Sequence, residues 1–391
     1  MGGWERLDDS KSTCFQTRHG TFLWVCPPLP GFSNQCVSYS TLIARHSSLK
    51  TGPVFWEQLL RGGAFELALS ATGKVFLMGV AGYLLISYGV LKAEALKAFS
   101  GLVAYLTLPC LVLSRFGEQF DTQRFPFWWM LVLAGAALQF VQIALGWLVA
   151  QRYRNHDPQD RAEMVMLIGF QNSGFFVLPM LQGLVPRAEF GHASILLFLF
   201  IIFFNASFWP VGTRVLLHQR GFDLKRILLA PPTLATLVAL VLFGLLPGPS
   251  HAFQKTLLGG MLFGTQSPGA LALLGDLTVP LATLVLGGTI GQVSSRGLAG
   301  FGLSAASLEI TLWKLVLIPA LGYALICFVP LVFADRSLRL LTMLEFAAPV
   351  AMNVAIFCQQ YQLPMKLTPV TSLLCYALCL LTVPFWCALV L

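Results

Sequence analysis

The sequence contains few charged residues. Only 11% of the 391 residues are Asp, Glu, Lys or Arg, whereas 56% are hydrophobic. Because a soluble protein is about one quarter charged, this composition excludes an ordinary soluble domain and indicates several membrane-spanning helices. The chain also lacks a P-loop and a nucleophile elbow, the motifs of ATP-driven pumps and many hydrolases. We therefore predict neither an enzyme nor an ATP-driven pump.

Pairs of metal-binding side chains are also absent. The nine cysteines form no CxxC pair, and the six histidines do not pair at helical spacing. Six of the cysteines fall inside apolar runs, where cysteine behaves as a small hydrophobic residue. The sequence therefore predicts no metal and no cofactor.

The first 60 residues differ from the rest. They contain no apolar run long enough for a signal peptide, and no acidic residue occurs from Ser10 to Trp56. Frequent Ser and Thr weakly resemble a transit peptide. We expect residues 1–60 to be a disordered N-terminal tail or an extension. No soluble domain is predicted elsewhere.

Beyond the tail, apolar runs are long enough to cross a bilayer, which takes about 20 residues each. Ten such runs lie near 66–87, 93–114, 127–150, 163–185, 190–213, 227–247, 270–293, 310–333, 340–361 and 367–390. They predict an integral, multi-pass protein in contact with membrane lipids. The net charge of +8 resides largely in short loops, as the positive-inside rule expects, so no nucleic-acid partner is predicted. The plasma membrane, the endoplasmic reticulum and another organelle all remain open.

Two pairs of prolines suggest an internal repeat. A Leu-Thr-apolar-Pro motif ends at Pro109 and again at Pro280, and Pro179 and Pro349 are separated by nearly the same interval. Five spans in each unit would reverse the orientation of the second unit, giving inverted repeats. We predict an all-α membrane protein of ten transmembrane helices in two inverted five-helix repeats. The first repeat covers residues 61–220 and the second covers residues 221–391.

The fourth and ninth spans are predicted to be broken and to cross each other. The fourth combines two adjacent amides, Gln171 and Asn172, with Gly174 and the helix breaker Pro179. The ninth combines a central proline with a nearby Asn. Backbone with unpaired polar groups is tolerated at membrane depth only inside protein or beside a wet cavity.

A broken helix exposes N–H groups that attract anions. Such groups can hold a carboxylate without a lysine at the bilayer centre, where a charge costs about 2.5–3.5 kcal/mol. The candidate substrate-binding residues are Gln171, Asn172, Ser173, Gly174, Pro179, Pro349 and Asn353. No catalytic residue is predicted.

Other polar residues within spans receive structural interpretations. Gln139 and Gln142 are expected to make interhelical hydrogen bonds. Glu345 is expected at the membrane edge, paired with Arg336 or Arg339, with proton coupling as the alternative. Lys314 is expected to be an interfacial anchor, with attraction of anions inward as the alternative. Close helix packing is predicted at Gly287, Gly288 and Gly291.

Several of these motifs resemble the auxin efflux carrier family, which includes plant PIN and PIN-like carriers and bacterial dicarboxylate carriers. The similarity covers about residues 66–390. It lies in Asn172-Ser-Gly followed by Pro179, in Pro280-Leu-Ala followed by Leu286-Gly-Gly, and in Pro349 ahead of Tyr361. The resemblance implies ten helices in two inverted repeats, with substrate beside a crossover, and suggests a homodimer.

The chain also departs from true PIN carriers. Gln171 stands where they have a proline, Val112 stands where they have a serine, and their long central loop is missing. A PIN-like or bacterial-type carrier of organic anions therefore fits better than a carrier of indole acids.

The leading hypothesis is a secondary active transporter that moves a small organic anion, a carboxylate, by alternating access. One alternative is a membrane receptor or scaffold with a degenerate transporter fold. The other is a sodium-coupled organic anion symporter.

Overall fold

The computed structural model divides the chain into two compact units, Met1–Glu57 and Gln58–Leu391. In the first unit it describes three antiparallel strands paired in the order β1-β2-β3: β1 (Arg6–Asp9), β2 (Ser12–Gln16) and β3 (Phe22–Val25). In the second unit it describes residues 63–122, 125, 127–218, 231–264, 267–297, 303–329 and 335–391. Most of the predicted tail lies outside these residues, so its disorder stays a prediction.

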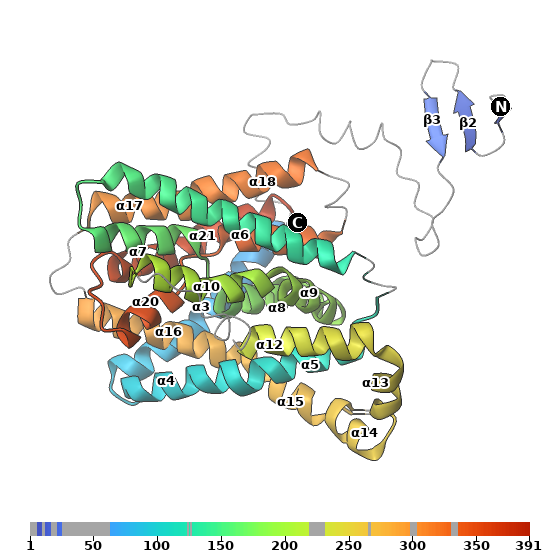
Figure 1. Cartoon of the computed structure of the whole chain (residues 1–391), viewed down its shortest axis with the longest axis horizontal. Helices are drawn as coiled ribbons and strands as arrows, with labels where there is room; N and C mark the ends of the chain where they lie inside the picture. The colour runs from blue at the N-terminus through green and yellow to red at the C-terminus, as the bar shows by residue number, and fades with distance from the viewer. Residues whose placement is uncertain are drawn as a thin grey trace. The chain divides into compact units, whose positions relative to one another are not determined.

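The described part of the second unit is built of helices (Figure 1). In chain order they are α3 (Ala64–Ser87), α4 (Ala93–Leu102), η1 (Val103–Thr107), α5 (Leu108–Gln119), α6 (Trp128–Ala150), η2 (Gln151–Tyr153), α7 (Pro158–Gly169), η3 (Ser173–Val177), α8 (Leu178–Leu184), α9 (Arg187–Phe200), α10 (Ile202–Val215), α12 (Pro231–Ala239), η4 (Leu240–Leu245), α13 (Pro247–Gln254), α14 (Leu257–Phe263), α15 (Ala270–Asp276), α16 (Thr278–Gly297), α17 (Ala305–Leu312), η5 (Trp313–Leu317), α18 (Ile318–Phe328), α19 (Arg336–Ala347), α20 (Asn353–Gln360) and α21 (Thr368–Ala388).

Within the described ranges, seven helices are long and apolar enough to cross a membrane. The pair Pro231–Leu245 and Pro247–Gln254, which bends by 97°, brings the number to eight if it forms one span. The predicted fourth and ninth spans are not among them, because each is interrupted. The structure thus bears out an all-helical membrane unit with seven or eight such spans.

Four helices contain a π-helical turn just before a proline. The turns η1, η3 and η5 are followed by Pro109, Pro179 and Pro319 as the second residue of the next helix, and η4 is followed closely by Pro247. A proline removes one N–H donor and crowds the carbonyl one turn earlier. At η1, η3 and η5 the wider π turn accommodates this proline and the helix continues, whereas after η4 the chain bends by 97° ahead of Pro247.

Helices α3 and α16 pack along each other with their backbones in contact. A Cβ atom on Gly82 would lie 2.1 Å from the carbonyl oxygen of Leu284, and one on Gly287 would lie 1.7 Å from that of Gly79. Such close approach needs residues without side chains, as is common between membrane helices. The predicted role of Gly287 in close packing is confirmed.

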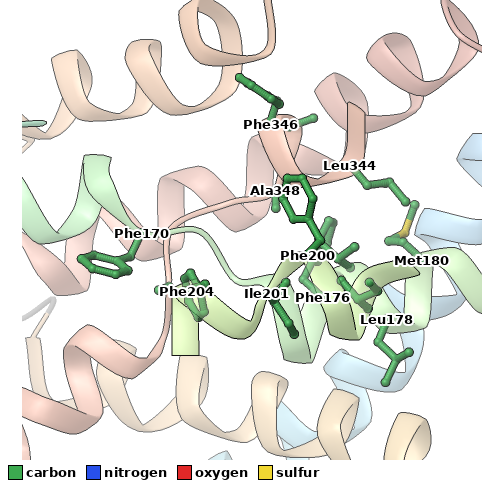
Figure 2. Close-up of a cluster of buried hydrophobic side chains, with 14 of the residues drawn as sticks. Phe170, Phe176, Leu178, Met180, Phe200, Ile201, Phe204, Leu344, Phe346 and Ala348 are labelled. Carbon is green, nitrogen blue, oxygen red and sulfur yellow. The ribbon is translucent and has the colours of Figure 1, made fainter. Parts of the chain in front are cut away.

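The core gathers around α9, whose Ile195, Leu197 and Leu199 are fully buried. Figure 2 shows the part of this core that surrounds the two interrupted helices, with Phe170 and Ala348 from the interruptions themselves. The rings of Phe170 and Phe204 meet edge to face with centroids 5.6 Å apart. The core therefore encloses the two interruptions on their apolar side.

Candidate functional site

The first interruption lies between α7 and η3. Helix α7 ends at Gly169, Phe170 takes an extended conformation, and helical structure resumes at Ser173. The π turn η3 then runs into α8, so that Ser173–Leu184 forms one short apolar helix. The predicted break is thus present, but Pro179 does not make it. That expectation is wrong, because Pro179 follows a π turn that accommodates its ring.

The second interruption lies between α19 and α20. Helix α19 ends at Ala347, Ala348 is extended, and α20 begins at Asn353. Here the proline does lie in the break, because Pro349 is among the non-helical residues. We call residues 170–172 together with residues 348–352 the junction.

The two halves of the junction pair through their backbones. The N–H of Asn172 donates to the carbonyl of Pro349 at 2.9 Å, and the N–H of Ala351 donates to that of Phe170 at 3.1 Å. Gln171 and Val350 face each other as a short antiparallel bridge. Buried backbone must find partners, and each interruption here supplies them for the other.

The end of α7 receives two further donors. Gln139 Nε2 on α6 donates to the carbonyl of Gly169 at 2.7 Å, and Lys314 Nζ on η5 donates to that of Ile168 at 3.0 Å. A helix C-terminus carries a partial negative charge, so the ammonium group stabilises it. Lys314 Nζ also donates to Gln142 Oε1 at 3.0 Å. The predicted interhelical bonds of Gln139 and Gln142 are confirmed.

Lys314 is not an interfacial anchor. Its side chain is 0% exposed, and it lies near the middle of the 24-residue apolar helix Ala305–Phe328. From that depth its ammonium cannot extend to the membrane surface, and it binds Gln142 and Ile168 instead. The expectation of an anchor at the membrane surface is therefore wrong.

Glu345 also lies deeper than predicted. It is 1% exposed, and its Oε2 accepts hydrogen bonds from Gln171 Nε2 at 2.9 Å and from Ser173 Oγ at 2.7 Å. The expected edge position is wrong, because the carboxylate lies just before the end of α19 and turns toward the other interruption. The site therefore contains a buried carboxylate as well as the buried ammonium of Lys314, whose charge acts on it.

Tyr376 on α21 ties the junction to a third helix. Its hydroxyl accepts from Asn172 Nδ2 and donates to the carbonyl of Val350 at 3.0 Å. Asn172 Oδ1 in turn accepts from the N–H of Phe175 at 3.2 Å, which caps η3. Both atoms of the Asn172 amide thus have partners within the protein.

Three side-chain oxygens in the described part of the site have no hydrogen-bond partner. They are Oε1 of Gln139, Oε1 of Gln171 and Oε1 of Glu345, on residues that are 2%, 2% and 1% exposed. Buried oxygens of this kind are uncommon and call for an explanation. Within the described ranges no group of three His, Cys, Asp or Glu residues is placed to hold a metal ion.

The remaining predicted residues border the junction. Gly174 is half-buried, and a Cβ atom built on it would meet nothing within 4 Å, so open space lies beside η3. Asn353 is half-buried at the first position of α20. Pro179 is buried in α8, farther along the helix that resumes at Ser173.

The sequence-based set therefore omitted Lys314, Glu345 and Tyr376. Lys314 gave no clear signal, because it lies near the start of the predicted run 310–333, where a lysine can extend to the membrane surface. Tyr376 gave none, because a tyrosine is common in apolar helices and its partner Asn172 is distant in the sequence.

Comparison with known proteins gives a family match over almost the whole helical unit. The profile of the family described as "Membrane transport protein" matches residues 68–225 and 214–387. These two segments together cover both interrupted helices.

Curated relatives come from Arabidopsis thaliana. Protein PIN-LIKES 7 is 21% identical over 397 residues, covering 82% of this chain and 96% of that protein. Protein PIN-LIKES 5 is 26% identical, over 46% of this chain and 43% of that protein. Protein PIN-LIKES 3 is 27% identical, over 46% and 45%. The matches to PIN-LIKES 5 and PIN-LIKES 3 thus span less than half the length of those relatives.

Proposed function

Because this chain belongs to the Membrane transport protein family, that of the auxin efflux carriers, we propose that it is a secondary active transporter of a small organic anion. It is an integral, multi-pass membrane protein. The substrate is a carboxylate, and transport proceeds by alternating access around the junction. One observation carries the proposal: two interrupted helices pair by backbone hydrogen bonds inside the core, next to buried polar side chains.

The helix ends at the junction suit an anion. The helix Ser173–Leu184 and α20 both begin there, and a helix N-terminus carries about half a positive charge. The open space beside Gly174 adjoins the first of these ends. Asn353 is the first residue of the second. We therefore place the substrate carboxylate beside Gly174, with the amides of Gln171 and Asn353 as further donors.

The packing of the other helices supports an inverted repeat of ten spans. The first predicted span, α3, packs on the seventh, α16. The sixth, α12, packs on the second, which contains α5 (Figure 1). In an inverted repeat the first span corresponds to the sixth and the second span corresponds to the seventh. Exchanging the two repeats therefore converts the pair of spans one and seven into the pair of spans six and two. The interrupted helices then occupy the same place in each half, as fourth and ninth spans.

Flux through reconstituted vesicles tests this function. A thermal-shift screen of lactate, benzoate, succinate and indole-3-acetate first selects the carboxylate that stabilises the purified protein most. Uptake of that compound into protein-containing vesicles should exceed uptake into protein-free vesicles. Asn172→Ala and Pro349→Ala should reduce it at least tenfold, because each disturbs the junction. Unchanged flux in both variants would contradict the site.

The same experiment separates the rival functions. A receptor or scaffold would show a thermal shift without net uptake. A sodium-coupled symporter would lose uptake when sodium is replaced by N-methylglucamine. Either result would replace the proposal above.

A further inference from the structure

Glu345 presents a problem for a site that binds anions. A carboxylate fully removed from water repels a second carboxylate strongly, because the low dielectric does not screen the two charges. The ammonium of Lys314 offsets this only in part, since it already binds Gln142 and the end of α7. An anionic substrate therefore binds more readily when Glu345 is protonated.

The partners of Glu345 can serve both of its protonation states. When it is ionised, its Oε2 accepts from Gln171 Nε2 and Ser173 Oγ, as observed. When it is protonated, its O–H needs an acceptor. An amide carries both a donor and an acceptor, and a hydroxyl can do either. Gln171 Oε1 is buried with no partner and becomes such an acceptor if the amide turns over.

The other buried carboxylate shows a contrasting design. Glu163 accepts from the backbone N–H groups of Lys366, Leu367 and Thr368 at 2.8–3.1 Å, which begin α21. Glu163 Oε2 also accepts from the hydroxyl of Thr368 at 2.6 Å. Backbone N–H groups donate and cannot accept, so three of these four partners suit the ionised form alone. Glu163 also leaves neither oxygen unpartnered, whereas Oε1 of Glu345 has no partner. Both observed partners of Glu345, an amide and a hydroxyl, can reverse the direction of their hydrogen bond, whereas three of the four partners of Glu163 cannot.

In the part of the chain that the structure describes, the helices packed against α19 leave Glu345 with one charged neighbour. Lys314 on η5 is the group whose charge acts on it. Helix α21 contributes the uncharged Tyr376 and Cys375. Helix α9 carries its charges near its start, and its His192 contacts Asp335 at the opposite end of α19. Neither η3 nor α8 carries a charged residue, and α18 carries none.

We propose that Glu345 is the proton carrier of this transporter, so that a carboxylate substrate and a proton cross the membrane together. This rests on the proposed function. Water on one side supplies a proton to Oε2 of Glu345, which then donates to the turned amide of Gln171, as the anion binds beside Gly174. On the other side the anion leaves and the proton returns to water, restoring the carboxylate. No covalent bond other than the O–H bond forms or breaks.

Infrared spectroscopy tests the protonation without any substrate. On acidification the wild-type protein in detergent should gain the C=O band of a buried carboxylic acid. Glu345→Gln keeps the shape and hydrogen bonds of the protonated side chain but cannot titrate, so it should lack this band. Glu309→Gln is the matched control, because Glu309 pairs with Arg152 and Tyr153 away from the junction. A band of the same size in Glu345→Gln as in the wild type would overturn the proposal, since the other buried carboxylate, Glu163, is present in both.

Vesicle transport tests the coupling with the selected carboxylate and a clamped membrane potential. A gradient of one pH unit should drive about tenfold accumulation in the wild type, since one unit corresponds to a tenfold ratio. Glu345→Gln should still exchange carboxylate across the membrane but should not accumulate it. Accumulation by Glu345→Gln, or wild-type uptake that moves no protons, would overturn the proton-carrying role alone. No carboxylate uptake by the wild type at all would overturn the transport function itself.

Discussion

The backbone N–H of Asn172 donates to the carbonyl of Pro349 at 2.9 Å, which joins two helices at the points where both are interrupted. Each interruption thereby satisfies backbone groups that the other leaves open. Polar side chains on neighbouring helices form hydrogen bonds with several of the remaining backbone groups.

The hydroxyl of Tyr376 is expected to stabilise the junction. Tyr376→Phe leaves the carbonyl of Val350 and the amide of Asn172 without this partner. We expect the free energy of unfolding to fall by about 1–3 kcal/mol, measured by denaturant titration in detergent. Tyr105→Phe is the control, because Tyr105 is 74% exposed and should change stability by less than about 0.5 kcal/mol. Equal effects in the two variants would refute a structural role for the Tyr376 hydroxyl.

The ammonium of Lys314 is expected to be coupled energetically to Gln142. Lys314→Met leaves two buried acceptors unpaired, Gln142 Oε1 and the carbonyl of Ile168, and should cost about 3 kcal/mol. Adding Gln142→Leu removes one of these acceptors, so the double variant should be more stable than the sum of the single effects predicts. Additive effects would show that the two side chains do not interact. Lys74→Met, at an exposed position of α3, is the control.

Two glycines of α3 should respond oppositely to the same substitution. Gly82→Ala places a Cβ atom 2.1 Å from the carbonyl of Leu284 and should destabilise the protein by about 1–3 kcal/mol through overpacking. A Cβ atom on Gly73 meets nothing within 4 Å, so Gly73→Ala should stabilise α3 by about 0.5–1 kcal/mol. Thermal unfolding of the two variants, compared with the wild type, measures both effects. Equal shifts would contradict the close packing of α3 on α16.

The ionised carboxylate of Asp335, at the start of α19, should stabilise the folded protein at neutral pH but not at acidic pH. The contact of its carboxylate with His192 lowers the pKa of the Asp335 carboxyl below its ordinary value of 3.8, helped by the N–H of Leu338. A carboxyl whose pKa is lower in the folded state than in the unfolded state stabilises the folded protein at pH values above the unfolded-state pKa. This stabilisation is lost as the pH falls through the folded-state pKa. Asn also caps helices, so Asp335→Asn removes mainly the charge.

Thermal unfolding as a function of pH checks this contribution. Wild-type protein should be the more stable at neutral pH, and its advantage over Asp335→Asn should shrink as the pH falls below about 4. An advantage that stays constant over the acid range would rule out a role for the Asp335 charge.

Much of the architecture could be predicted from local sequence. The long apolar runs marked most spans, and the amides and proline near Gln171 and Pro349 marked the two interruptions. Pro179 misled, because a proline at a π turn does not end a helix. Whether the helix continues through Pro179 depends on the widened turn before it, and the sequence alone does not show that turn.

The partners within the site were not predictable in the same way. Glu345 bonds Gln171, and Lys314 bonds Gln142, each across more than 170 residues of sequence. Local position suggested a membrane edge for both charged residues. The two side chains are buried because the two halves of the chain pack against each other. This packing cannot be derived from a single sequence.

The most direct measurement concerns access to the junction from the two sides of the membrane. Gly174→Cys, in protein whose Cys327 and three N-terminal cysteines are replaced by Ser, puts a thiol beside the proposed carboxylate position. A membrane-impermeant maleimide should modify it when added from either side of sealed vesicles, and the carboxylate selected by thermal shift should slow both reactions. Modification from one side only, or from neither, would contradict alternating access at the junction.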